Sequence, residues 1–398
     1  MQKRKASLAV IFGIVFIDLV GFGIVIPVLP LYAERFGASP LMVGGLLAVY
    51  SLMSFLFSPV LGRLSDRIGR RPVLLVSILG SSVGFLIMGL AGSLPFLFLG
   101  RIIDGITGGN ISTAQAYIAD ITAPHERSKG MGLIGAAFGL GFIFGPAIGG
   151  VMSHFSLAAP LLFAAALALL NAVAVYLFLP ESLPKEHRTR DVSENVPFYM
   201  AVRKAKGSPL ALVLGAYFFS TVAFSLLTAT YPLFASHRFG YGAPQVGYIF
   251  AGMGIVGAVI QGGMMGLLVR TFGDSRLASV GAVLLAAGLV FLPVSSSAPL
   301  LFLATAAIGL GHALVVTPLN GLASKVSRAA EQGKVLGMMQ SCSSLARIIG
   351  PVLGGWMLNL DLLRVEAYYG RAPYWTAAAI VLVACGLTLC IRVSGEAA

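Results

Sequence analysis

Long apolar segments are the feature that most limits what this chain can fold into. Twelve of them, each near the roughly 20 residues that a helix needs to cross a bilayer, can be read along the 398 residues. Inside a bilayer every backbone polar group needs an internal partner, and segments of this length satisfy that need as helices. We therefore predict an all-α membrane protein with twelve transmembrane helices. The predicted spans are 8–32, 41–61, 73–92, 95–118, 130–153, 158–180, 210–235, 244–268, 277–295, 299–322, 333–358 and 373–391.

The composition agrees with a membrane protein. Hydrophobic residues make up 57% of the chain and charged ones only 11%, whereas about a quarter of a typical soluble domain is charged. The first apolar run carries Asp18 and lacks a small-residue cleavage site, so we do not expect it to be a signal peptide. The three cysteines all fall in predicted spans, and they predict neither a disulfide framework nor a metal site.

The positive charges indicate the orientation of the helices. Of the 27 Lys and Arg, 21 lie on the side of the N-terminus, the even-numbered loops and the C-terminal tail, and four lie on the opposite side. The last two, Arg101 and Arg347, fall inside spans. This asymmetry predicts a multi-pass protein of the cell membrane with both termini in the cytoplasm. The net charge of +12 is divided among loops between apolar spans, which argues against a nucleic-acid partner.

The chain contains an internal repeat. Four residues of one predicted span recur 205 positions later, and Glu126 and Gly132 recur at the same offset as Glu331 and Gly337. The recurring residues are Gly145, Pro146, Gly149 and Gly150, which return as Gly350, Pro351, Gly354 and Gly355. We predict two six-helix bundles, 1–180 and 210–398, joined by a cytoplasmic linker at 181–209. Parallel repeats of this kind place a substrate site between the halves, near the membrane midplane.

A short basic loop joins the second and third predicted spans. Five of the eleven residues in 62–72 are charged, four of them Arg, so we expect a tight loop at the membrane surface. A loop this short holds its side chains where the two helices place them. Its notable residues are Gly62, Asp66, Arg67, Gly69, Arg70 and Arg71. A weaker copy stands at 266–276, which keeps Arg270, Gly273, Asp274 and Arg276.

Glycines in the fifth predicted span recur at a spacing of four. Gly135 and Gly139 form one set, and Gly141, Gly145 and Gly149 form another, so each set lines one helix face. Small residues let a neighbouring helix approach closely, and Pro146 removes a backbone donor. The pattern fits simple tight packing or a smooth contact for a rocking motion. The copy around Pro351 predicts an equivalent contact in the second half.

Three ionisable residues lie within spans of the first half. A charge at the bilayer centre costs roughly 3 kcal/mol or more, so such residues usually face a cavity and serve function. Arg101 and Asp104 are three residues apart on one helix and can pair directly, which leaves a purely structural pair as an alternative. Asp18 has no charged neighbour in its own span, so it must pair across helices or be protonated for part of the time. We predict that Asp18 carries a coupled proton, with Asp104 as second candidate and Arg101 modulating both.

The second half is polar inside its spans without being acidic. Its candidate substrate-cavity residues are Gln261, His312, Asn320, Gln340 and Arg347. His312 fits a hydrogen-bonded structural role or a proton relay, and Asn320 fits contact with a substrate or with another helix. Arg347 stands mid-span and would suit a substrate with an anionic group. Aromatic residues that could line an apolar cavity are Phe55, Phe57, Tyr217, Phe218, Phe219, Phe224 and Tyr231.

Four motifs in order resemble the major facilitator superfamily, and within it the twelve-helix drug:proton antiporters similar to bacterial tetracycline/proton antiporters. They are 18–30, 62–72, 101–109 and 135–150. The resemblance implies that 62–72 is a cytoplasmic gate and that 135–150 is the motif characteristic of exporters. It also implies acidic residues in the third and ninth helices, where this chain has Gly84 and Gly288. That departure puts tetracycline as the substrate in doubt.

Two classes of function follow. The first is proton-coupled export of drugs or other amphipathic small molecules by alternating access. The alternative is transport of a specific metabolite, organic anion, sugar or lipid, and a non-transporting receptor is a more distant option. Without a nucleophile–base pair or a phosphate-binding loop, we expect neither an enzyme nor ATP-driven transport. Expected partners are the lipid bilayer, a small-molecule substrate and protons. We expect a monomer with no metal and no cofactor beyond the coupling proton.

Overall fold

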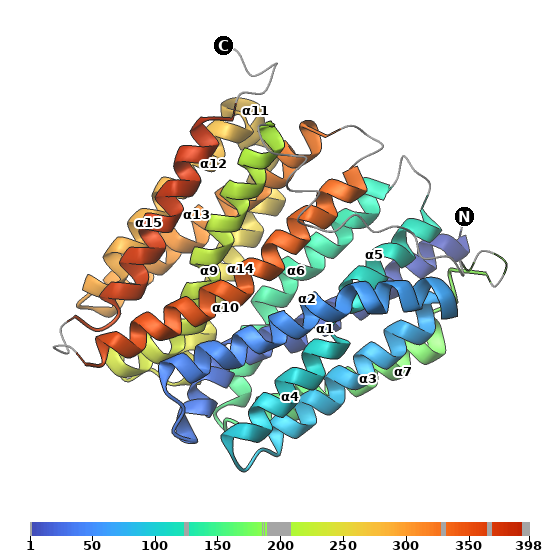
Figure 1. Cartoon of the computed structure of the whole chain (residues 1–398), viewed down its shortest axis with the longest axis horizontal. Helices are drawn as coiled ribbons and strands as arrows, with labels where there is room; N and C mark the ends of the chain where they lie inside the picture. Colours follow the sequence, from blue (N-terminus) through green and yellow to red (C-terminus); the bar gives the residue numbers. More distant parts are fainter. Residues whose placement is uncertain are drawn as a thin grey trace. The chain divides into compact units, whose positions relative to one another are not determined.

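The computed structural model describes residues 2–122, 127–184, 186, 188, 208–327, 332–363 and 368–391 (Figure 1). This described part is helical, with turns between the helices and no strand. The predicted all-α fold is confirmed. The repeat partners Glu126 and Glu331, and most of the predicted linker 181–209, lie outside the described residues.

Contacts divide the chain into two compact units. Unit 1 comprises Met1–Ala38, Val49–Glu194 and Gly240–Ala251, and unit 2 comprises Ser39–Ala48, Asn195–Phe239 and Gly252–Ala398. The helices up to α7 are α1 (Gln2–Arg35), α2 (Pro40–Ile68), α3 (Arg70–Gly89), α4 (Leu94–Thr107), α5 (Asn110–Ile121), α6 (Arg127–Met152) and α7 (Ala159–Phe178). Those that follow are α9 (Pro209–Phe239), α10 (Ala243–Val259), η3 (Ile260–Met264), α11 (Met265–Phe272), α12 (Asp274–Phe291), η4 (Leu292–Val294), α13 (Ala298–Lys325), α14 (Gln332–Asp361) and α15 (Arg371–Leu389). The predicted boundaries 1–180, 181–209 and 210–398 stay a prediction.

Ten segments in the described part are long and apolar enough to cross a membrane. The two remaining predicted spans are also helical. Span 333–358 forms α14, and span 95–118 is divided into α4 and α5 at Gly108 and Gly109. The sequence predicts a single helix for 95–118. Two adjacent glycines, which are poor helix formers, explain the break.

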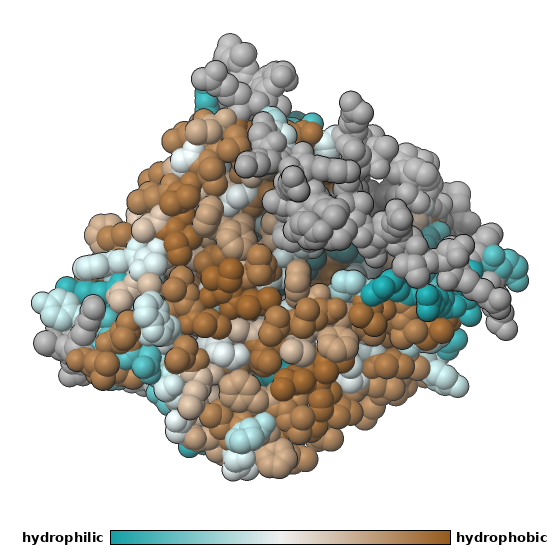
Figure 2. Space-filling model, viewed as in Figure 1, coloured by the Kyte–Doolittle hydropathy of each residue, from teal (hydrophilic) through white to brown (hydrophobic). Residues whose placement is uncertain are grey.

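Large apolar side chains lie exposed along the helices. Leu170, Tyr176 and Phe178 of α7 are all more than 60% exposed. Figure 2 shows apolar residues covering most of the visible helix surface. Exposed apolar surface on this scale is what a lipid-facing helix presents.

The predicted loop 62–72 is for the most part not a loop. α2 continues to Ile68 and α3 begins at Arg70, so only Gly69 lies between them. The charged residues form the last turns of α2, beyond the apolar part of the helix that would lie in the bilayer. Gly69 has φ of 110°, a conformation that glycine adopts without strain, and it lets the chain reverse within one residue.

One of the two predicted glycine faces packs tightly. In unit 1 a Cβ added at Gly145 would lie 2.6 Å from Cα of Gly23 in α1, and one at Gly141 would lie 2.8 Å from Cβ of Leu19. Gly135 and Gly139 make no such contact with α1, since an added Cβ at either meets nothing within 4 Å, and a close contact at these two glycines stays a prediction. Six residues separate Gly135 from Gly141, which turns them about 120° apart around the helix. The second face therefore points away from α1.

The copy of this motif in unit 2 makes an equivalent contact. There α14 packs on α9 as α6 packs on α1 (Figure 1). A Cβ added at Gly350 would lie 2.6 Å from the carbonyl oxygen of Val222, and Gly354 faces Leu226 at 2.7 Å. The repeat in sequence is thus a repeat in helix packing.

Each Gly-Pro helix also packs on the first turns of another helix, and those turns are grouped with its own unit. In unit 1, Gly247 of α10 faces the carbonyl oxygen of Pro146, and Gly150 faces that of Pro244 at 3.0 Å. In unit 2, Gly44 at the start of α2 faces the carbonyl oxygen of Pro351. These contacts account for the grouping of the two short segments 39–48 and 240–251 with the units that contain them.

Candidate functional site

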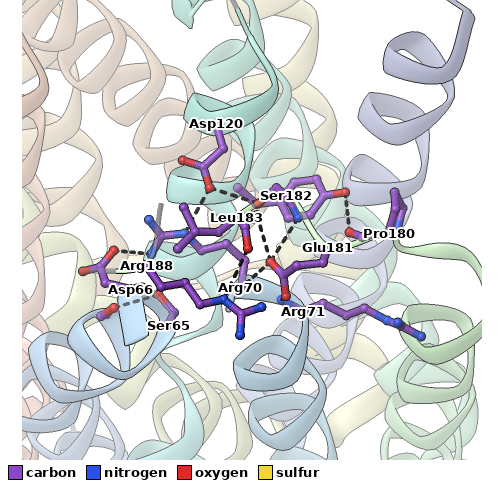
Figure 3. A network of polar contacts seen from close by, with 12 residues as sticks. Ser65, Asp66, Arg70, Arg71, Asp120, Pro180, Glu181, Ser182, Leu183 and Arg188 are labelled. Atoms are coloured by element: carbon purple, nitrogen blue, oxygen red, sulfur yellow. Dashed lines mark hydrogen bonds and ion pairs between the residues drawn. The ribbon is translucent and has the colours of Figure 1, made fainter. Parts of the chain in front are cut away.

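A network of polar contacts surrounds the start of α3 (Figure 3). The guanidinium of Arg70 lies 2.6 Å from Asp66 of α2 and 3.1 Å from Asp120 at the end of α5. It also donates a 2.6 Å hydrogen bond to the hydroxyl of Ser65. Arg70 is buried, and these three acceptors satisfy its charge. One guanidinium therefore fastens the ends of α2, α3 and α5 together.

Glu181, just after α7, caps the N-terminus of α3. Its carboxylate accepts hydrogen bonds from the backbone N–H groups of Arg70 at 2.9 Å and Arg71 at 3.2 Å. These groups have no partner within α3, because the first four N–H groups of a helix are left unpaired. The next residue, Ser182, donates to Asp120 at 2.9 Å. The segment after α7 thus belongs to the network, as Figure 3 shows.

The structure separates the residues predicted for this loop into two groups. Asp66, Gly69, Arg70 and Arg71 contact the network, and the Arg71 side chain donates to the carbonyl oxygen of Tyr176. Gly62 contributes only its carbonyl oxygen, which accepts a 2.7 Å hydrogen bond from the hydroxyl of Ser65, and Arg67 stands apart with an exposed side chain. Sequence reasoning missed Ser65, Asp120 and Glu181. Ser65 lies inside the motif itself, whereas the other two are far away in sequence.

Unit 2 holds a pair with the opposite arrangement of charges. Asp274, the first residue of α12, pairs with Lys325, the last residue of α13. These positions lie 204 and 205 residues after Arg70 and Asp120. The weaker copy of the basic loop therefore also takes part in an ion pair, with an acidic residue at the position of Arg70 and a basic residue at that of Asp120.

A second polar cluster in unit 1 lies within predicted spans. Arg101 and Asp104 are almost fully buried and form an ion pair of 3.1 Å. Asp18 of α1 is half-buried, forms a hydrogen bond with Asn110 and lies close enough to Asp104 to interact electrostatically. Asp104 also bonds to the side chain of Ser81. The three predicted proton-coupling residues are therefore neighbours.

Two parts of this cluster were not foreseen. The ring of Tyr50 lies under the Arg101 guanidinium, with 4.2 Å from the guanidinium carbon to the ring centroid. Asn110 is the first residue of α5, immediately after the break at Gly108 and Gly109. Its side-chain amide lies beside Asp18, so the start of α5 contributes to the cluster.

The five predicted polar residues of unit 2 do not form one cluster. His312 of α13 stacks on Phe224 of α9, with ring centroids 3.7 Å apart. Arg347 of α14 interacts with Tyr217 of α9, whose hydroxyl bonds to Ser343. Gln261 is exposed in η3. Among the described residues, no hydrogen bond joins Gln261, Asn320 or Gln340 to another member of these five.

The two glycines that replace expected acidic residues lie at close helix contacts. A Cβ at Gly84 would be 2.8 Å from the carbonyl oxygen of Gly100 and 2.9 Å from Cβ of Asp104. At Gly288 it would be 2.7 Å from a side-chain carbon of Ile308. Neither position has room for a carboxylate, so the departure from the exporters' pattern is built into the packing.

A model of the Major Facilitator Superfamily matches residues 11–274 and residues 213–396. The two matches together span most of the chain.

Bacterial resistance proteins are among the relatives. The chain is 34% identical over 399 residues to the tetracycline resistance protein, class C, of Escherichia coli, covering 98% of this chain and 96% of that protein. It is 30% identical over 403 residues to multidrug resistance protein 2 of Bacillus subtilis (strain 168), with 98% and 96% covered. Among solved structures, the human organic anion transporter MFSD10 (TETRAN) shares a TM-score of 0.72 at 25% identity, covering 97% of this chain and 99% of that one.

Proposed function

The chain belongs to the Major Facilitator Superfamily, and on that premise we propose that it exports drugs or other amphipathic small molecules in exchange for protons. It is a multi-pass membrane transporter and not an enzyme. The relatives named for tetracycline and multidrug resistance support the substrate class. We further propose that transport proceeds by alternating access in a monomer, with no cofactor besides the proton.

The observation that carries proton coupling is the cluster around Asp18. Two carboxylates, Asp18 and Asp104, share one guanidinium, that of Arg101. With both carboxylates ionised the cluster has a net charge of −1 in an apolar span, which is costly. One bound proton restores neutrality. Asp18 is the better carrier because Arg101 is already paired with Asp104, whereas Asp18 bonds to the neutral amide of Asn110.

The experiment measures substrate-induced proton release from proteoliposomes, with a panel of tetracyclines, lipophilic cations and organic anions. The wild-type protein should accumulate at least one substrate against its gradient when a pH gradient is imposed. Asp18→Asn should bind that substrate without accumulating it. The control is Glu186→Gln, which removes an exposed carboxylate outside the cluster. An Asp18→Asn protein that builds the same substrate gradient as wild type would move the proton site to Asp104.

We also propose that the network around Arg70 is a gate at the cytoplasmic face. The 21 basic residues on the side of the basic loop support this orientation. Both termini would then lie in the cytoplasm of a cell whose plasma or inner membrane holds the protein. A reporter fused after Ala398 that is active only outside the cell would refute the orientation.

A further inference from the structure

Arg347 is an arginine inside a predicted span, and none of the described carboxylates pairs with it. In the described part of 210–398 the acidic residues are Asp274 and Asp361. Asp274 pairs with Lys325, and Asp361 accepts hydrogen bonds from the N–H groups of Gly370 and Ala372. Asp361 also stands 14 residues along α14 from Arg347, about 21 Å away on a straight helix. No ion pair joins Arg347 to any described carboxylate.

A guanidinium in a span without a counter-charge is costly, so its presence points to a ligand or a water-filled cavity. The groups around Arg347 favour a ligand. The phenol of Tyr217 interacts with it electrostatically and hydrogen-bonds to the side chain of Ser343. Ser343 and Arg347 are four residues apart and lie on the same face of α14, one turn from each other. A guanidinium fork beside two hydroxyl groups, one of which keeps a free proton after their mutual hydrogen bond, is a set of donors that suits a planar carboxylate.

On α9, aromatic side chains and polar groups lie on the same side of the helix as Tyr217. Tyr217, Ser220 and Phe224 are spaced three and four residues apart, which places them on one side of the helix. Phe224 is stacked face to face with His312, the two planes being 7° apart. Nδ1 of His312 and Oγ of Ser220 are buried without a hydrogen-bond partner among the described residues. Buried polar atoms without a partner are rare in native structures, and a bound ligand or water would supply the missing hydrogen bonds.

We propose that unit 2 binds a small aromatic carboxylate, with the carboxylate on Arg347, Tyr217 and Ser343 and the ring along Phe224 and His312. Tyr217 and Phe224 are seven positions apart on α9, a rise of about 10.5 Å, which fits a molecule of two fused rings. This assignment rests on the proposed function as a transporter and narrows its substrates to amphipathic molecules that carry a negative group.

The test compares two probes of the same shape, 2-naphthoate and its neutral amide 2-naphthamide, by titration of the purified full-length protein in lipid nanodiscs. Wild type should bind the carboxylate about tenfold to a hundredfold more tightly, the range expected for a hydrogen bond to a charged group. Arg347→Gln should remove that preference, while Arg347→Lys keeps the charge but loses the fork and should retain part of it. The matched control is Arg270→Gln, an exposed arginine of the same unit at the end of α11, which should behave as wild type.

Equal binding of the two probes by wild type, or no binding of either, overturns the proposal. So does a preference for naphthoate that survives Arg347→Gln. If Arg347→Gln does not fold, Tyr217→Phe combined with Ser343→Ala should weaken naphthoate binding several-fold, and no change in that double variant is equally fatal. Proton release in response to lipophilic cations distinguishes failure of this inference from failure of the proposed function. If the wild-type protein releases protons with these cations but does not bind naphthoate, only this inference fails. If no probe causes proton release, the proposed function fails.

Discussion

The glycine contact between α1 and α6 makes a quantitative prediction that two single substitutions test. In Gly145→Ala the new Cβ lies 2.6 Å from Cα and 2.8 Å from the carbonyl carbon of Gly23. Ordinary contacts of a Cβ are 3.4–4 Å, so the separation is short by roughly 1 Å. Both contacted atoms are backbone, so no side chain can rotate away and α1 itself must shift.

The cost of such overpacking is about 1–3 kcal/mol. Replacing glycine by alanine inside a helix also gains up to about 1 kcal/mol. The control Gly139→Ala gains the same helix propensity two turns earlier in α6, where the added Cβ meets nothing within 4 Å. Propensity therefore cancels between the two variants, and the difference in their unfolding free energies should be the packing term of about 1–3 kcal/mol.

The assay is thermal or denaturant unfolding of both variants in the same detergent, with substrate-driven proton release measured in parallel. Gly139→Ala should match or exceed wild type in stability, and Gly145→Ala should be less stable than either. Unit 2 offers the same comparison on α14, where Gly350 faces the Val222 carbonyl at 2.6 Å and Gly337 faces open space. Equal stability of Gly145→Ala and Gly139→Ala would refute the reasoning, because it would mean that α1 and α6 do not meet at Gly145.

Three further predictions concern the charged networks. Asp66→Asn should slow transport yet leave substrate affinity largely intact, because Arg70 keeps Asp120, and a collapse of affinity at unchanged rate would contradict the gate. Glu181→Gln should lower thermal stability by about 1 kcal/mol, the usual worth of a helix cap, whereas Glu186→Gln should not. Asp274→Lys should destabilise unit 2, and adding Lys325→Asp should restore part of that loss in a double-mutant comparison. Additive effects in that last comparison would show that the pair contributes nothing.

Local spacing explains what could be predicted from the sequence. The ion pair of Arg101 and Asp104 needs only a helix, since residues three apart lie on one face. The tight contact at Gly145 and its copy at Gly350 need only a neighbouring helix on the glycine face of α6 and of α14. Spacing also shows that Gly135 and Gly139 share a face, but it does not show what that face meets.

Contacts between distant segments could not be predicted in this way. Asp120 and Glu181 reach Arg70 from 50 and 111 residues away in sequence, and neither carries a local pattern that separates it from an ordinary surface carboxylate. Asn110 was hidden by the assumption that 95–118 forms one helix. The pair Gly108-Gly109 was a signal for a break, but tight helix packing explains adjacent glycines in a span just as well.

The exchanged signs of the two ion pairs have a consequence for which one can open. A helix carries partial positive charge at its N-terminus and partial negative charge at its C-terminus. In unit 2, Asp274 begins α12 and Lys325 ends α13, so both charges complement their helices. In unit 1, Arg70 begins α3 and Asp120 lies in the last turn of α5, so both charges oppose theirs.

Glu181 offsets that opposition by placing a carboxylate on the first N–H groups of α3. The pair around Arg70 therefore depends on a residue outside its own helices, in the segment that follows α7. If that segment moves, α3 loses its cap and Arg70 faces a helix terminus of its own sign, a penalty of about 0.3–1 kcal/mol beyond the lost hydrogen bonds. Because both charges of the unit 2 pair complement their helix ends, we expect the unit 1 network to be the one that breaks and re-forms during transport, while the unit 2 pair stays closed.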